Sequence, residues 1–197
     1  MANIVKFRPF TLNDVDFIHM CKNDSKLNSI TVGQWHPFSR EEAERWVMGC
    51  INNTPDYRFW AVCTPDEEQH AVGWVALTKI NPDEGSACFH SVVVADKEYR
   101  DGLAWIECYK FIYNYAFIEL GLQKVYGSQF TDHLASSAIS KAFFTNEERI
   151  EYGAVVKNGI PHDVRHSYLL RDAYLQHLEA GDYQTNAIIK RIVKPIK

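Results

Sequence analysis

The chain has 197 residues, of which 46% are hydrophobic, 13% aromatic and 23% charged, a balance typical of one globular domain with a full hydrophobic core. Its formal net charge of −4 argues against general nucleic-acid binding, which depends on a basic surface. A membrane span is not expected either, because the sequence contains no apolar run of about 18 residues.

The first quarter of the chain predicts a strand and two helices. Residues 3–10 alternate between apolar and polar and indicate a strand, and residues 12–22 indicate a short helix. Residues 24–38 show no period and are expected to be irregular. Ser39 and Glu42 then form a capping box, in which each side chain bonds the other residue's backbone N–H. Apolar residues recur at helical spacing after this box, so a longer helix is expected.

The middle of the chain predicts three strands and one long helix. Residues 57–64 and 71–80 form a hairpin around an acidic turn, and residues 86–94 form a third strand. Residues 103–120 are almost entirely apolar apart from one polar stripe, so this helix is expected to be largely buried. Gly121 ends it in a left-handed conformation.

The last third predicts alternating strands and helices, at residues 124–130 (strand), 134–143 (helix), 150–157 and 162–170 (strands) and 172–180 (a last helical turn). The order is βααβββαβαββ, and the expected fold class is an α/β (α+β) mixture on a mostly antiparallel sheet. Residues 1–180 are expected to form a single domain, followed by a basic tail at residues 181–197. This tail docks on the domain, docks on a second chain or stays solvated.

The polar turn at residues 95–102 directly precedes the long helix. The first N–H groups of a helix have no partner within the helix, and the helix dipole makes this end positive. The turn is therefore a candidate site for a pyrophosphate group.

Cysteine usage indicates reduced thiols. The five cysteines are odd in number and widely spaced, with no C-x-x-C, so neither a disulfide framework nor a zinc site is predicted. The eight histidines are scattered, and no metal is expected. The chain begins without the basic and apolar stretches of a signal peptide, and a cytoplasmic location is therefore expected.

Four segments carry recognisable motifs: HPFSREEAERWV (36–47), EYRDGLAWIE (98–107), YAFIELGLQKV (115–125) and VKNGIPHDVRHSYLLRD (156–172). Together they resemble the GNAT acyltransferase superfamily over roughly residues 5–175, and most closely its Rim-type branch, which acetylates N-terminal amines of ribosomal proteins. The resemblance implies a GNAT fold with flanking helices, in which two central strands splay and acyl-CoA lies in the gap.

The resemblance also implies a cofactor site. The diphosphate contacts carried over by position are Arg100, Asp101, Gly102, Leu103 and Ala104, the pantetheine contacts are Val93 and Val94, and His133 stands where relatives carry an Asn that bonds backbone near the cofactor.

The loop departs from the pattern of its relatives, Q/R-x-x-G-x-G/A. If Arg100 is the first position, Leu103 and Trp105 replace the two small residues. If the window moves back by one, Gly102 and Ala104 keep the small residues and the basic residue is lost. The downstream motif favours the first register, in which Trp105 could cover the loop donors.

Two residues are candidates for the chemistry of acyl transfer. His90, on the strand before the loop, is the candidate base, because its ordinary pKa suits proton acceptance near neutral pH. Ser136, which matches a Rim-type serine, is the candidate proton donor to the leaving thiol. The alternative for His90 is packing within the sheet, and for Ser136 it is the satisfaction of a helix N-terminus. The segment that walls the acceptor pocket in relatives contains Trp35, His36 and Phe38, for which core packing is the alternative.

The expected function is an acetyl-CoA-dependent N-acetyltransferase. A primary amine, on a protein N-terminus or a small molecule, would attack directly in a ternary complex, and no metal is required. The alternative is a non-catalytic binding module that keeps the fold and has lost CoA. No partner is expected among nucleic acids or membranes, and a homodimer is left open.

Overall fold

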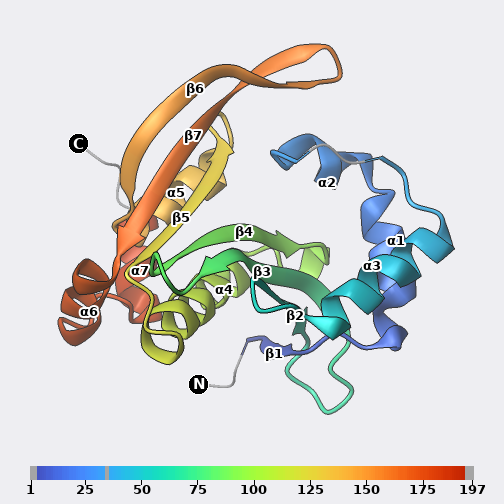
Figure 1. Cartoon of the computed structure of the whole chain (residues 1–197), viewed down its shortest axis with the longest axis horizontal. Coiled ribbons are helices and arrows are strands. Elements are labelled where there is room, and N and C mark those ends of the chain that lie inside the picture. The colour runs from blue at the N-terminus through green and yellow to red at the C-terminus, as the bar shows by residue number, and fades with distance from the viewer. Residues whose placement is uncertain (1–3, 34–35, 194–197) are drawn as a thin grey trace.

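The computed structural model describes residues 4–33 and 36–193, apart from the side chain of His90 (Figure 1). Within these residues the strands form one seven-stranded sheet in the order β1-β2-β3-β4-β5-β7-β6. The strands are β1 (Lys6–Arg8), β2 (Tyr57–Cys63), β3 (Ala71–Asn81), β4 (Ser86–Val94), β5 (Lys124–Phe130), β6 (Asn146–Lys157) and β7 (Ile160–Leu170). Neighbouring strands are antiparallel except β4 and β5, which confirms the predicted fold class.

Helices cover both faces of this sheet. They are η1 (Leu12–Asp14), α1 (Val15–Lys22), α2 (Ser25–Ile30), α3 (Arg40–Asn52), η2 (Lys97–Tyr99), α4 (Leu103–Asn114), η3 (Tyr115–Glu119), α5 (Leu134–Ala142), α6 (Arg171–Glu179) and α7 (Thr185–Val193). No helix of the described part of the chain is long and apolar enough to cross a membrane.

Two buried apolar clusters lie on the two faces of the sheet. Because side chains alternate along a strand, neighbouring residues of β3 and β4 belong to different clusters. Trp74 and Val93 pack with α1 and α3, whereas Val75 and Val94 pack with α4. The sheet therefore separates a layer made by α1–α3 from a layer made by α4, α5 and α7.

The two central strands are paired only at one end. β4 and β5 pair in parallel at Ser86–Lys124, Ala87–Val125 and Cys88–Tyr126, and no further. β4 continues along β3 as far as Val94, and β5 continues along β7 as far as Phe130, so the strands splay (Figure 1). This is the predicted splay.

Most predicted elements are present, and two helices were missed: α2 in the first quarter and α7 within the predicted tail. Residues 24–38 are not entirely irregular, because α2 lies within them. Asp24 caps this helix by accepting hydrogen bonds from the N–H groups of Lys26 and Leu27, and Leu27 is buried. The capping box of Ser39 with Glu42 is confirmed, as is the left-handed Gly121 after the long helix.

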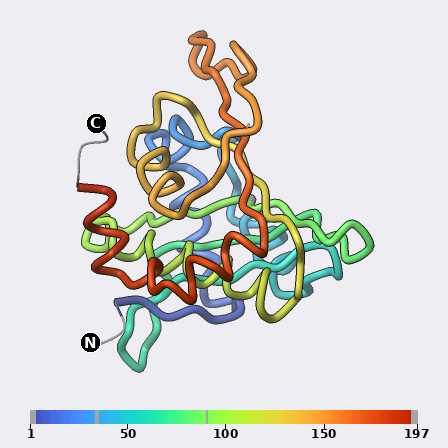
Figure 2. The backbone as a smooth tube through the Cα atoms, turned by 90° about the vertical axis from the view of Figure 1, so that its left-hand side faces the viewer, coloured from blue at the N-terminus to red at the C-terminus, as the bar shows by residue number. Residues whose placement is uncertain are grey.

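The end of the chain packs on the domain. Residues 171–193 form α6 and α7, and Ile188 of α7 is fully buried in the cluster beneath α4. Arg191 donates from Nε to the carbonyl of Ala142 at 3.0 Å, which ties α7 to α5. Figure 2 shows these helices on the body of the molecule and the β6–β7 hairpin projecting from it. Docking on the domain is therefore the arrangement that the structure shows as far as Val193.

Gly73 should be essential for the joint of β3 with β4. A Cβ at this position would lie 2.0 Å from the carbonyl oxygen of Val93. We expect Gly73→Ala to lower the free energy of unfolding by roughly 2–4 kcal/mol, because the contact is with backbone that cannot move aside. Gly49→Ala in α3 is the control: its Cβ meets nothing within 4 Å, and Ala favours a helix. Equal denaturant midpoints for Gly73→Ala and the wild type would contradict the prediction.

Candidate active site

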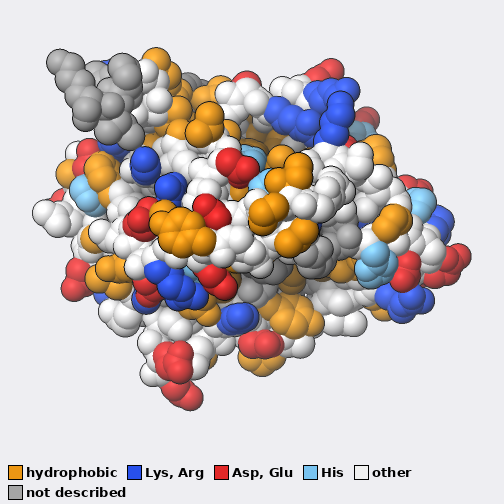
Figure 3. Space-filling model, turned by 90° about the horizontal axis from the view of Figure 1, so that it is seen from above, with side chains coloured by type: hydrophobic (Ala, Val, Ile, Leu, Met, Phe, Trp, Pro, Cys, Tyr) orange, Lys and Arg blue, Asp and Glu red, His pale blue; other side chains and the backbone are white. Residues whose placement is uncertain are grey.

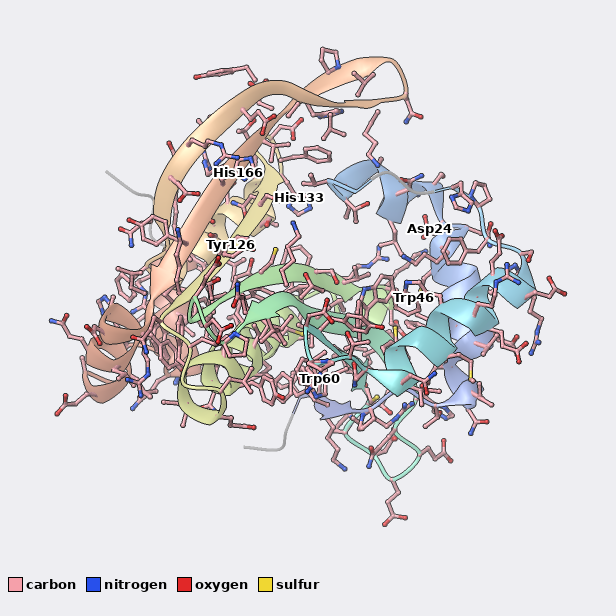
Figure 4. The ribbon with its side chains drawn as sticks, viewed as in Figure 1. Asp24, Trp46, Trp60, Tyr126, His133 and His166 are labelled. Carbon is pink, nitrogen blue, oxygen red and sulfur yellow. The ribbon has the colours of Figure 1, made fainter. Side chains whose placement is uncertain are left out.

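A cavity of about 440 Å³ opens where β4 and β5 part. Its wall combines the ends of β4 and β5 with α4 and α5 on one side and with α1, α3 and the α2 segment on the other. Figure 4 shows His133 and Tyr126 on one side and Trp46 on the other. Among the described residues that line it, none is an Asp or a Glu. The cavity is thus largely apolar and aromatic, with few polar groups, as ligand sites usually are.

The β6–β7 hairpin reaches over this cavity to α2. Near the hairpin tip, Lys157 donates from Nζ to Oδ1 of Asn28 at 3.1 Å and to the carbonyl of Gly33 at 2.5 Å. The face seen from above, on which this hairpin lies, exposes apolar side chains among charged ones (Figure 3). Exposed apolar residues of the hairpin include Tyr152, Val156 and Ile160.

The predicted pantetheine contacts lie at the cavity. Val93 and Val94 both line it and are almost fully buried. They pair with Trp74 and Gly73 of β3, so only the edge of β4 that faces β5 is left without a strand partner. Unpaired backbone N–H and C=O groups need partners, and an extended ligand with amide groups could supply them.

The predicted diphosphate loop is bonded to its own chain. Asp101 accepts a hydrogen bond from the N–H of Leu103 at 2.9 Å, so a carboxylate sits at the start of α4. Gly102 has φ of 93°, a conformation that favours glycine. Arg100 donates to the carbonyls of Val94 at 3.1 Å and of Ala95 at 2.5 Å. Neither these loop residues nor Ala104, which is fully buried, is among the described residues of the cavity wall.

Trp105 lies beside His133 in the cavity wall. The two rings stack with centroids 5.8 Å apart and planes 16° apart, and both line the cavity. His133 is the N-cap of α5, since its Nδ1 accepts from the N–H of Ser136 at 3.0 Å. Nδ1 is therefore unprotonated. His133 thus performs the capping part of the role expected of an Asn.

Ser136 belongs to a polar network on the α4 and α5 side of the cavity. Its Oγ donates to Oε1 of Gln129 at 2.8 Å. It also forms a hydrogen bond with the hydroxyl of Tyr109. Burial raises the pKa of Tyr109 to about 12, and the hydrogen bond with Ser136 opposes part of this increase. Gln129 and Arg165 both donate to Oγ of the neighbouring Ser137, at 3.4 and 3.2 Å.

Tyr109 and Gln129 are site residues that the sequence analysis missed. A signal for Tyr109 exists, because it lies one helical turn after Trp105 and therefore on the same face of α4. Gln129 lies on the same face of β5 as Gly127, but a polar residue in a strand carries no specific signal.

The other predicted residues fall in three places. Phe38 packs against the cluster of α1–α3, and His36 is exposed, 5.4 Å from the Phe38 ring and 3.6 Å from Glu42. The structure brings neither into the cavity wall. Trp35 lies outside the described residues. His90 is the extra residue of β4 where its register with β3 shifts, and its side chain is not described.

The chain has four buried cysteines and one half-buried cysteine, Cys88, and all five are free thiols. No cysteine is among the described residues of the cavity wall, and no group of three or more His, Cys, Asp or Glu in the described part of the chain could hold a metal ion. This arrangement provides no thiol beside the cavity for a covalent intermediate.

Comparisons with known proteins point to one family. The family model described as an acetyltransferase (GNAT) domain matches residues 5–143. A curated relative, the FsC-acetyl coenzyme A-N(2)-transacetylase of Aspergillus fumigatus, is 30% identical over 112 residues, which are 52% of this chain and 46% of the relative. The match thus spans about half the length of that relative.

Solved structures share the fold at low sequence identity. The spermidine N-acetyltransferase of Vibrio cholerae in complex with CoA and spermine has a TM-score of 0.76 and 23% identity, and the match covers 87% of this chain and 98% of that one. A dodecameric structure of the same enzyme gives 0.72 and 22%, over 88% and 98%.

The buried thiols should resist modification in the folded protein. Burial raises the pKa of Cys21 and Cys50 to about 12 and that of Cys63 to about 11. At pH 8 a thiol with a pKa of 12 is ionised in about one molecule in ten thousand, and the thiolate is the reactive form. We expect the disulfide reagent DTNB to react slowly, with Cys88 first, and to titrate five thiols in guanidinium. A rapidly reacting thiol other than Cys88 would contradict this.

Proposed function

The chain belongs to the GNAT acetyltransferase family, and on this premise we propose that it transfers an acetyl group from acetyl-CoA to a primary amine. The acceptor is a protein N-terminus or a small molecule, which attacks directly in a ternary complex. The observation that carries this proposal is the splay of β4 and β5, which opens into the cavity.

The free edge of β4 supports binding of the pantetheine arm. From Phe89 to Val94 this edge has no strand partner, while the other edge is bonded to β3. A pantetheine chain carries two amide groups and could pair with this edge as a short strand would. Arg100 holds the carbonyl of Val94, which leaves the groups nearer the splay for the ligand.

The start of α4 is the proposed diphosphate site, where the carboxylate of Asp101 opposes binding of an anion. The helix end with Gly102, Leu103 and Ala104 is the right kind of site for an anion. The carboxylate of Asp101 already bonds the N–H of Leu103, so the diphosphate must displace it or accept its repulsion. Arg100 lies within the same loop, and its positive charge offsets part of this repulsion.

We assign the proton transfers to residues on both sides of the splay. The attacking amine must be neutral, and His90 of β4 is our proposed base. The leaving thiolate needs a proton, for which Ser136 is the proposed donor. The hydrogen bonds of Ser136 to Tyr109 and Gln129 orient its hydroxyl and connect it to a buried donor.

The cavity wall favours an apolar acceptor over a polyamine. The Vibrio cholerae neighbour was solved with spermine, a polycation. Here no described residue of the wall is a carboxylate, and Lys22 contributes a positive charge. The described residues of the wall offer a polycation no carboxylate partner, so we propose a monoamine or an N-terminus with an apolar neighbour. An N-terminal acceptor and the motif at residues 156–172 both support our proposal that the chain belongs to the Rim-type branch. The reduced thiols support our proposal of a cytoplasmic location.

The alternative is a GNAT-fold binding module without catalysis. It is favoured by the carboxylate of Asp101 on the loop and by the stack of Trp105 with His133 in the cavity wall. The two functions differ in whether acetyl-CoA binds at all.

Acetyl-CoA should raise the melting temperature of the full chain. A ligand that binds only the folded state stabilises it by about 2.7 kcal/mol at a hundred times its Kd. We expect a shift of several degrees at millimolar acetyl-CoA, measured by differential scanning fluorimetry. S-acetyl-N-acetylcysteamine, an acetyl thioester without the diphosphate, is the control and should shift it little. Equal and negligible shifts for both compounds would rule out the transferase and leave the binding module.

Asp101→Asn should bind acetyl-CoA more tightly than the wild type. Asn keeps an oxygen that can accept from the N–H of Leu103, so this hydrogen bond survives while the negative charge is lost. Removing about 1 kcal/mol of repulsion lowers the Kd roughly five-fold at low salt, and less at high salt. Asp83→Asn, in the exposed turn between β3 and β4, removes the same charge at the opposite end of β4. Calorimetry in which both variants bind equally would contradict our placement of the diphosphate.

A further inference from the structure

The last residue of α1 places its amine among aromatic rings. Nζ of Lys22 lies 4.9 Å from the ring centroid of Trp46, 5.5 Å from that of Trp74 and 5.4 Å from that of Phe38. All three distances are within the range of about 6 Å at which a cation interacts favourably with an aromatic face. We call the three rings the aromatic cage.

The cage is held rigidly by its neighbours. Trp46 meets Trp74 edge-on at 5.9 Å and 64°, and Phe59 at 5.5 Å and 80°. Phe10 contacts the other side of Trp46 at 5.6 Å and 89°. Trp74 is only 3% exposed. The packed rings around the Lys22 amine therefore restrict the conformations that this side chain can adopt.

The cage opens into the cavity at the end of β4. Lys22, Trp46 and Trp74 line the same cavity as Val93, and Trp74 pairs directly with Val93 across the two strands. These three residues line the cavity on the side of the α1–α3 layer, where Figure 4 labels Trp46, whereas Ser136 lines it on the side of the α4 and α5 layer. The chain thus provides a primary amine of its own on the acceptor side of the splay.

We propose that Lys22 is an acetyl acceptor, which the protein modifies in its own cavity when an acyl thioester is bound; this inference rests on the proposed transferase function. The amine nitrogen forms a bond to the thioester carbonyl carbon, and the bond from that carbon to sulfur breaks. The nitrogen loses a proton and the thiolate gains one, so the products are an N-acetyl-lysine and the free thiol of CoA.

Burial of Lys22 assists this reaction, and the reaction stops after one turnover because the nitrogen of the product is an amide and no longer a nucleophile. Burial lowers the pKa of Lys22 from its ordinary value, so a larger fraction of the amine is neutral and able to attack. After transfer the positive charge is lost, and with it the attraction to the cage. The acetamide group is larger than the amine and takes up part of the acceptor side.

The test is mass spectrometry of the full chain after incubation with acetyl-CoA alone. We expect one added acetyl group, mapped by peptide analysis to Lys22 and at least about tenfold above the label on the exposed Lys26, because a fixed intramolecular amine reacts as if highly concentrated. The rate should not change when the protein is diluted tenfold. Lys22→Arg keeps the cation in the cage and should lose this label, whereas Lys26→Arg should keep it.

Parallel assays separate failure of this inference from failure of the proposed function. If acetyl-CoA stabilises the protein and an added amine releases CoA, but Lys22 stays unmodified, the inference is overturned and the transferase stands. Equal labelling of Lys22 and Lys26, or the same label in urea-unfolded protein, also overturns it. If acetyl-CoA neither binds nor turns over, the proposed function fails and the inference with it.

Discussion

The point at which β4 and β5 stop pairing determines the position of the cavity and the kind of ligand that it can bind. Beyond Cys88 and Tyr126 each strand is bonded to one outer neighbour, β4 to β3 and β5 to β7, so the two facing edges have no strand partner among the described residues. Gly127 permits a close approach directly after the last β4–β5 pair, since a Cβ there would lie 3.2 Å from the carbonyl oxygen of Phe89. Backbone groups on these edges need water or a ligand, and an amide-containing chain fits this need better than a compact metabolite.

Strand alternation gives the two sides of the splay different surroundings. Val93 points to the layer of α1–α3, where the wall is aromatic, and Val94 points to the layer of α4, near the loop that would hold an anion. Ser136 and its partners belong to the second layer. An acceptor and a donor can therefore approach the splay from different sides, as direct attack in a ternary complex requires.

The fold could be predicted from sequence because its signals are local and periodic, whereas much of the site depends on contacts that are distant in sequence. The capping box of Ser39 and the left-handed Gly121 can be recognised in the sequence from their residue types alone. Asp24 is an equally good cap, but it precedes only six helical residues, too few to show a period. Tyr109 and Ser136 meet across two helices that are separated by a strand. No local pattern encodes that contact, and only the resemblance to a family indicated Ser136.

The carboxylate at the start of α4 weakens the transferase function but does not exclude it. The hydrogen bond from the N–H of Leu103 to the carboxylate of Asp101, which precedes the N-cap Gly102, contributes about 1 kcal/mol, and a favourable charge at a helix N-terminus contributes at most a similar amount. A diphosphate carries more charge than one carboxylate and can take the same N–H groups, while Arg100 stays beside the loop. The hydrogen bond of Asp101 is therefore weak enough to be displaced by a ligand that also pairs with the edge of β4 that faces β5. This balance, together with an amine already present on the acceptor side, favours catalysis over a binding module.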